Sequence, residues 1–130
     1  MSQTLPKSER LRSRKTIALL FSEGKSITAA PVRMTWVPAV NADSSFFQFA
    51  VTVPKKNFKR AVDRNRLKRQ TREGVRKNKS ELVNILTGKN SPYALMFIFT
   101  GKEKVSYKEI EQQIVLILNR FLRTIEKLNA

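Results

Sequence analysis

The spacing of apolar residues predicts a helix near each end of the chain. Between residues 13 and 21, Ile17, Leu20 and Phe21 recur at intervals of three and four, which is the period of an amphipathic helix, and Gly24 ends it. Near the other end, Ser106 and Glu109 have the spacing of a capping box that starts a helix. That helix presents one apolar stripe, formed by Ile110, Ile114, Ile117, Phe121, Ile125 and Leu128. We expect this stripe to cover one face of a sheet.

Three segments between these helices have the pattern of β-strands. Residues 31–40 alternate, so that Arg33 and Thr35 lie on the face opposite to larger apolar residues. Residues 46–53 also alternate, and their second face is semi-polar, formed by Phe46, Gln48, Ala50 and Thr52. Residues 93–99 are apolar on both faces, as in a strand buried in the middle of a sheet.

The remaining segments complete a single domain. Residues 1–12 are polar and predicted to be loose, residues 41–45 predict a turn, and residues 81–86 predict a helical turn. A polar helix over residues 60–77 separates the second strand from the third, which gives the order α-β-β-α-β-α. The fold class is therefore α+β, a two-layer sandwich with a sheet of three or four strands. Without further information, the β-α-β crossover is expected to be right-handed.

The net charge of the chain narrows the classes of partner that it can bind. The 130 residues include 26 basic and 10 acidic side chains, a net charge of +16. Residues 55 to 79 alone hold twelve bases and two acids. Such an excess of positive charge favours binding of a polyanion. Nucleic acid is the usual polyanion for a cationic globular domain. An anionic membrane would require a basic helix with a large apolar face, which residues 61–77 lack.

Catalysis by this chain alone is not expected. With no histidine and no cysteine there is no imidazole base, no thiolate nucleophile and no zinc site. The carboxylates are dispersed, and Asp63 and Glu73 stand ten residues apart, unlike a two-carboxylate metal site. No apolar run has the length of a signal peptide or a membrane span. Together with the lack of cysteine, this predicts a soluble cytoplasmic protein.

The helix over residues 60–77 carries more charge than an ordinary solvated helix. Solvated helices usually alternate acids and bases four residues apart, whereas acids here are almost absent and most of the bases are arginine. The planar guanidinium binds phosphate through two hydrogen bonds and stacks on bases. The few apolar residues are scattered in angle, so that only part of the helix can contact the core; they are Ala61, Val62, Leu67 and Val75.

The segment VPKKNFKRAVDRNRLKRQTREGVRK, residues 53–77, closely resembles the signature region of the protein subunit of bacterial ribonuclease P. That pattern is a strand ending in two lysines, a short link, an alanine, R-N-R, a hydrophobic residue, K-R and R-E. The matching residues are Lys55, Lys56, Ala61, Arg64, Asn65, Arg66, Leu67, Lys68, Arg69, Arg72 and Glu73. The rest of the chain fits the family more loosely, by its pattern of helices and strands.

The resemblance implies that a large RNA subunit with bound Mg²⁺ is the catalyst and that this protein is its accessory. The protein itself would bind no cofactor and would act as a monomer in a 1:1 complex with the RNA. The substrate would be precursor tRNA, from which the 5′ leader is removed. The resemblance also implies the rare left-handed β-α-β crossover, as in a domain of a small-subunit ribosomal protein.

The family's functional residues carry over to two sets in this sequence. The set implied to bind the RNA subunit is Arg64, Asn65, Arg66, Lys68, Arg69 and Arg72. The set implied to form the leader-binding cleft is Ile17, Phe21, Thr35, Thr52 and Lys56. Two positions depart from the pattern: Ile17 stands where the family commonly has an aromatic residue, and Gln70 replaces a usual aliphatic residue.

Composition alone leaves other classes open. A ribosomal or other structural RNA-binding protein is also a basic α/β domain without catalytic residues. A DNA-architectural protein ranks below it, because no helix-turn-helix or basic-zipper pattern is present. A free-standing protein nuclease ranks last, for want of bases and metal ligands.

Overall fold

The computed structural model describes residues 14–38, 47–89 and 93–128, and the structural statements below concern these residues. The elements follow one another as α1 (Arg14–Glu23), β1 (Lys25–Ala29), β2 (Val32–Pro38), β3 (Phe47–Thr52), α2 (Ala61–Asn78), α3 (Ser80–Lys89), β4 (Tyr93–Phe99) and α4 (Tyr107–Leu128). The predicted flexible segment 1–12, the turn at 41–45 and the side chains of Phe46 and Leu128 lie outside the described residues.

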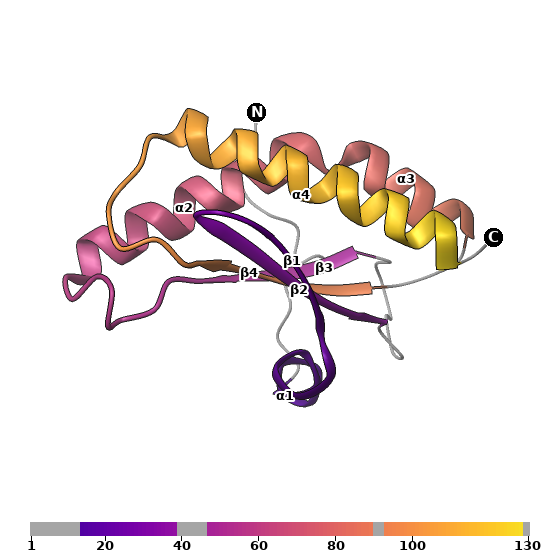
Figure 1. The fold of residues 1–130 in the computed structure, drawn as a ribbon, viewed down its shortest axis with the longest axis horizontal. Coiled ribbons are helices and arrows are strands. Elements are labelled where there is room, and N and C mark those ends of the chain that lie inside the picture. The colour runs from indigo at the N-terminus through magenta and orange to yellow at the C-terminus, as the bar shows by residue number, and fades with distance from the viewer. Residues whose placement is uncertain (1–13, 39–46, 90–92, 129–130) are drawn as a thin grey trace.

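One mixed sheet of four strands forms the centre of the fold, in the order β1-β2-β4-β3. β4 is antiparallel to β2 and parallel to β3, so the strand that is apolar on both faces is central, as predicted. Helices α2, α3 and α4 lie on one side of this sheet and α1 lies on the other (Figure 1). The α+β class is confirmed, whereas the left-handed sense of the crossover from β3 to β4 stays a prediction.

The main core lies between the sheet and the long helices. The predicted stripe of α4 is buried at each described position, and Phe121 packs against the rings of Trp36 and Tyr93 with centroids 5.2 and 5.5 Å away. Ser106 caps α4, because its Oγ accepts a hydrogen bond of 3.2 Å from the backbone N–H of Glu109. A smaller cluster on the opposite face joins Leu20 of α1 to side chains of the sheet.

The structure corrects the predicted element list in two places. β1 was not predicted, because it is only five residues long and mostly polar; three of its five residues are exposed, as is usual for an edge strand. Its signal is the alternation of Ile27 and Ala29, which contact the main core, with Ser26 and Thr28. The helical turn predicted at 81–86 is the longer helix α3.

Helix α2 contacts the core through only two of its four apolar residues, as their scattered angles predict. Its inward face is a regular stripe of Leu67, Thr71, Gly74 and Val75, all buried, while Ala61 and Val62 are exposed. The Thr71 hydroxyl is satisfied by the Leu67 carbonyl at 2.8 Å. A Cβ atom on Gly74 would lie 2.8 Å from Cδ1 of Ile114, so glycine here allows α2 to approach α4 closely. The sequence pattern missed this stripe because a threonine and a glycine complete it.

Candidate nucleic-acid interface

The outward face of α2 is an array of exposed basic side chains. Arg66, Arg69 and Arg72 are exposed, as is Asn65, and Lys68 is half-buried. Among the described residues, none of the three exposed arginines has an acidic partner within ion-pair distance. Because these guanidinium groups repel one another in the free protein, they favour a partner that brings negative charge.

The two acids of α2 do not neutralise this array. Oδ1 of Asp63 lies 3.0 Å from Nζ of Lys104, in the link before α4. The hydrogen bond from Lys104 lowers the pKa of the Asp63 carboxyl below its usual value. Glu73 accepts hydrogen bonds from Arg76, which lower its pKa in the same way. Both carboxylates are therefore paired, and the exposed arginines of α2 keep their charge uncompensated.

Arg64 differs from the rest of the predicted RNA-subunit set. Its side chain is half-buried, and Nη1 donates hydrogen bonds of 2.8 Å to the carbonyls of Phe58 and Lys59. Two of the five N–H directions of the guanidinium thus point at the link between β3 and α2. Arg64 holds that link in place, and only part of its guanidinium faces outward.

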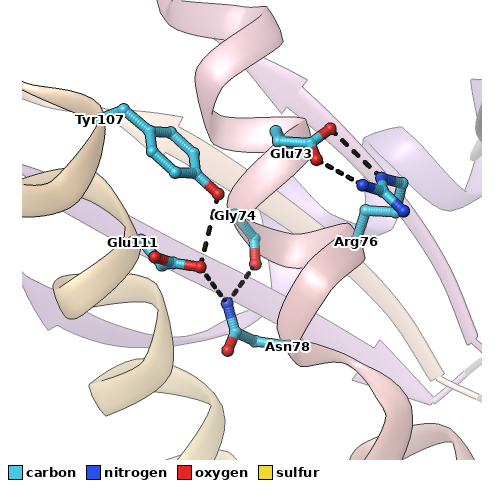
Figure 2. Close-up of polar contacts among 6 residues, drawn as sticks. All are labelled: Glu73, Gly74, Arg76, Asn78, Tyr107 and Glu111. Atoms are coloured by element: carbon cyan, nitrogen blue, oxygen red, sulfur yellow. Dashed lines mark hydrogen bonds and ion pairs between the residues drawn. The ribbon is translucent and has the colours of Figure 1, made fainter. Parts of the chain in front are cut away.

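A polar cluster fixes the far end of α2 against α4 (Figure 2). Oε2 of Glu111 accepts hydrogen bonds from Nδ2 of Asn78 at 3.0 Å and from the Tyr107 hydroxyl at 3.4 Å. The same Asn78 amide donates to the carbonyl of Gly74 at 2.8 Å. Burial, followed by the charge of Glu111, raises the pKa of the Tyr107 hydroxyl. These contacts, with the close approach at Gly74, give the basic helix one fixed position on the domain.

The predicted leader-binding residues lie around the other face of the sheet. Phe21 on α1 is 67% exposed, which is unusual for a phenylalanine and leaves its ring free to stack on a base. Ile17, one helical turn earlier, is half-buried and packs against the small cluster that contains Ile98. Thr52 ends β3 on this face and is half-buried, and Lys56 is exposed in the turn that follows.

Thr35 is less accessible than the other leader residues. It is 6% exposed, and a Cβ atom on Gly24, at the end of α1, would lie 2.3 Å from its Cγ2. Its hydroxyl lies 3.2 Å from Oγ of Ser26 on β1. Phe21 and Lys56 are therefore exposed, Ile17 and Thr52 are half-buried, and Thr35 is buried beside the end of α1.

The acidic side chains of the described residues do not gather into a cluster. The described part of the chain contains no group of three or more aspartate, glutamate, histidine or cysteine side chains close enough to hold a metal ion. Asp63 and Glu73, the acids nearest to the basic array, are occupied by Lys104 and Arg76. In the same part of the chain, no helix is long and apolar enough to cross a membrane.

Comparisons with known proteins agree with this geometry. Residues 5–122 match the family model described as Ribonuclease P. The chain is 34% identical over 108 residues to the ribonuclease P protein component of Porphyromonas gingivalis, covering 83% of this chain and 79% of that one. It is 32% identical over 126 residues to the ribonuclease P protein component of Chlorobium phaeobacteroides, covering 89% and 86%.

Solved structures show the same fold. The RNase P protein of Staphylococcus aureus superposes with a TM-score of 0.67 at 19% identity, covering 87% of this chain and 94% of that one. The RNase P protein of Thermotoga maritima superposes with a TM-score of 0.65 at 25% identity, covering 86% and 96%.

Proposed function

The chain belongs to the ribonuclease P protein family, and on that premise we propose that α2 binds the catalytic RNA while the sheet face beside α1 binds the 5′ leader of precursor tRNA. Proteins of this family are subunits of a holoenzyme whose RNA subunit is catalytic, and they aid maturation of the tRNA 5′ end. The family match decides against a ribosomal, DNA-architectural or free-standing nuclease function.

The uncompensated arginines on α2 carry the proposal for the RNA subunit. The proposed contacts are Arg64, Asn65, Arg66, Lys68, Arg69 and Arg72. Arg66, Arg69 and Arg72 are exposed on one rigid helix whose own acids are already paired, so their charge is available to phosphates. Arg64 contributes indirectly as well, because it fixes the link that carries Lys55 and Lys56.

The leader would bind where an exposed ring and a lysine flank a half-buried sheet surface. A single strand is recognised by stacking of its bases and neutralisation of its phosphates, which Phe21 and Lys56 can supply. Ile17 and Thr52 would line the floor of this surface, and Thr35 would support it from beneath α1.

The proposal also covers the metal ions, the stoichiometry and the location of the complex. We place Mg²⁺ with the RNA subunit, which is the catalyst in this family. The metal ions supply the chemistry of phosphodiester cleavage, and the protein binds and positions the two RNAs. One protein per RNA subunit and a cytoplasmic location complete the proposal.

Reconstitution tests this function directly. The protein would be added to the catalytic RNA of the same organism at limiting Mg²⁺, and leader release from precursor tRNA would be measured. We expect the wild-type protein and an Arg123→Ala control on α4 to restore cleavage equally. Simultaneous replacement of Arg66, Arg69 and Arg72 by alanine should abolish the effect while the fold is retained. Failure of the wild-type protein to restore cleavage would contradict the proposal.

A further inference from the structure

One row of side chains on the α1 face crosses the sheet from the β1 edge to the β3 edge. Pairing between strands places Arg33 opposite Ile98, and Ile98 opposite Thr52. Neighbouring strands are about 4.8 Å apart, so Arg33 and Thr52 stand roughly 10 Å apart with Ile98 between them. Arg33 therefore shares a surface with a predicted leader residue, although it lies outside the signature segment.

Helix α1 leaves this row open while covering the rows beside it. On β4, Ala94 and Met96 are 0% and 5% exposed, whereas Ile98 is only half-buried. On β2, Thr35 is buried and Arg33 is exposed. Figure 1 looks nearly along the axis of α1, which crosses the strands beneath the sheet. A nucleic-acid strand that followed the open row would therefore run alongside α1, the helix that carries Phe21.

The guanidinium of Arg33 is held in position rather than paired with an acid. Its Nε and Nη2 both donate to Oγ of Ser26 on β1, each at 3.3 Å. Because Ser26 accepts both bonds, its own proton is directed to the Thr35 hydroxyl, 3.2 Å away. Among the described residues Arg33 has no acidic partner, so its charge and its remaining N–H groups stay available at the surface.

From this arrangement we propose that Arg33 binds a phosphate of the single-stranded leader on the β2 side of the leader site, across β4 from Thr52 and the turn that carries Lys56. The inference rests on the proposed leader site and extends it across the sheet. Ile98 provides apolar surface between Arg33 and Thr52, and the exposed ring of Phe21 on α1 is available to stack on a base. Ser26 is a positioning residue, because it acts on RNA only by orienting the guanidinium.

The test compares precursor tRNA with mature tRNA in binding to the reconstituted holoenzyme. Arg33→Ala should weaken precursor binding about threefold to tenfold and leave mature tRNA binding unchanged. Ser26→Ala keeps the charge and should cause a smaller loss of the same kind. Arg123→Ala, which removes an exposed arginine of α4 on the other side of the sheet, should change neither affinity. Circular dichroism of each variant checks that its fold is retained.

Shortening the leader one nucleotide at a time gives a second readout. Since Arg33 lies on β2 and Lys56 follows β3, on the two sides of β4, the effects of Arg33→Ala and Lys56→Ala should vanish at different leader lengths. Equal losses for precursor and mature tRNA, or no loss for either, would overturn the role of Arg33. If Phe21→Ala and Lys56→Ala also left precursor selectivity intact, the leader site itself would be wrong. If Phe21→Ala and Lys56→Ala reduced precursor selectivity but Arg33→Ala did not, the leader site would stand and only the role of Arg33 would be wrong.

Discussion

A single nitrogen of Arg64 donates to the carbonyl groups of two consecutive residues, Phe58 and Lys59, in the link before α2. Nη1 lies 2.8 Å from the Phe58 carbonyl and 2.8 Å from the Lys59 carbonyl. The Phe58 ring is buried, with its centroid 5.7 Å from that of Phe99. The link between β3 and α2 is thereby fixed from within the core and from the helix.

Arg64 and Arg69 should therefore respond differently to replacement by alanine. Arg64→Ala leaves two carbonyls without their donor and should lower the free energy of unfolding by about 1–2 kcal/mol. Arg69→Ala removes an exposed, self-repelling charge and should leave that free energy equal or slightly higher. Both should weaken binding to the RNA subunit. Urea denaturation with parallel binding titrations measures the two effects, and equal stabilities would contradict the structural role of Arg64.

Gln70, inside the basic helix, lowers the stability of the fold. Its Oε1 atom is buried and has no hydrogen-bond partner among the described residues. Gln70→Leu removes this unsatisfied group and adds an apolar side chain beside the Leu67 stripe. We expect the free energy of unfolding to rise by about 1 kcal/mol, with RNA binding unchanged. Gln70→Ala is the control for polarity alone, and a loss of stability in Gln70→Leu would contradict this view of the site.

The paired acids of α2 predict an acid-dependent stability. The pKa values of Asp63 and Glu73 are lowered in the folded state from ordinary values of 3.8 and 4.5. Their contribution is fully present above those values, and it is lost as pH falls through the lower folded pKa values. Asp63→Asn combined with Glu73→Gln should flatten the decline of melting temperature below pH 4.5. Because both pairs are partly exposed, high salt should reduce the difference from wild type.

The sequence predicted the larger elements because their periodicities are strong, and it missed features that depend on tertiary contact. The alternation around Trp36 and the stripe of α4 were sufficient to place β2 and the helix that covers it. β1 was not predicted from the sequence, because an edge strand needs no continuous apolar face.

Within the candidate site, the signature segment identified the basic residues. It did not show which of them make hydrogen bonds inside the protein and which are available to RNA. Arg64 is bonded to a link that only the fold brings beside it, and Thr35 is covered by the end of α1. Arg33 could be assigned to the correct face from the alternation of β2. Its place opposite Ile98 and in line with Thr52 required the strand order, since β4 follows β2 by more than fifty residues.

Lys56 should contribute to leader binding through charge rather than through base recognition. Neutralising one phosphate of a single strand changes the slope of log K against log salt by about 0.7. Lys56→Ala should therefore make the salt dependence of precursor binding shallower by about that amount, with little change in preference among leader sequences. The measurement is a series of binding titrations at increasing salt with two leaders of different sequence. An unchanged slope would remove Lys56 from the leader path.

The protein should act on binding and not on the bond-breaking step. The bases of residues 55 to 79 can offset repulsion between two polyanionic RNAs, which otherwise only Mg²⁺ and salt would screen. Omitting the protein should raise the Mg²⁺ concentration that cleavage requires and weaken binding of precursor more than of mature tRNA. Single-turnover cleavage at saturating Mg²⁺ and saturating RNA should be nearly independent of the protein.

Asp63→Asn and Glu73→Gln provide the sharpest check that the protein takes no part in the bond-breaking step. These substitutions remove the acids of α2 and leave every base in place. Because both acids are paired, to Lys104 and Arg76, each would have to give up an ion pair before it could bind a metal ion or transfer a proton. The saturated single-turnover rate should therefore remain within about twofold of wild type, which corresponds to less than roughly 0.5 kcal/mol in the barrier. Abolition of that rate in a folded variant that still binds the RNA subunit would place a protein carboxylate in the catalytic centre.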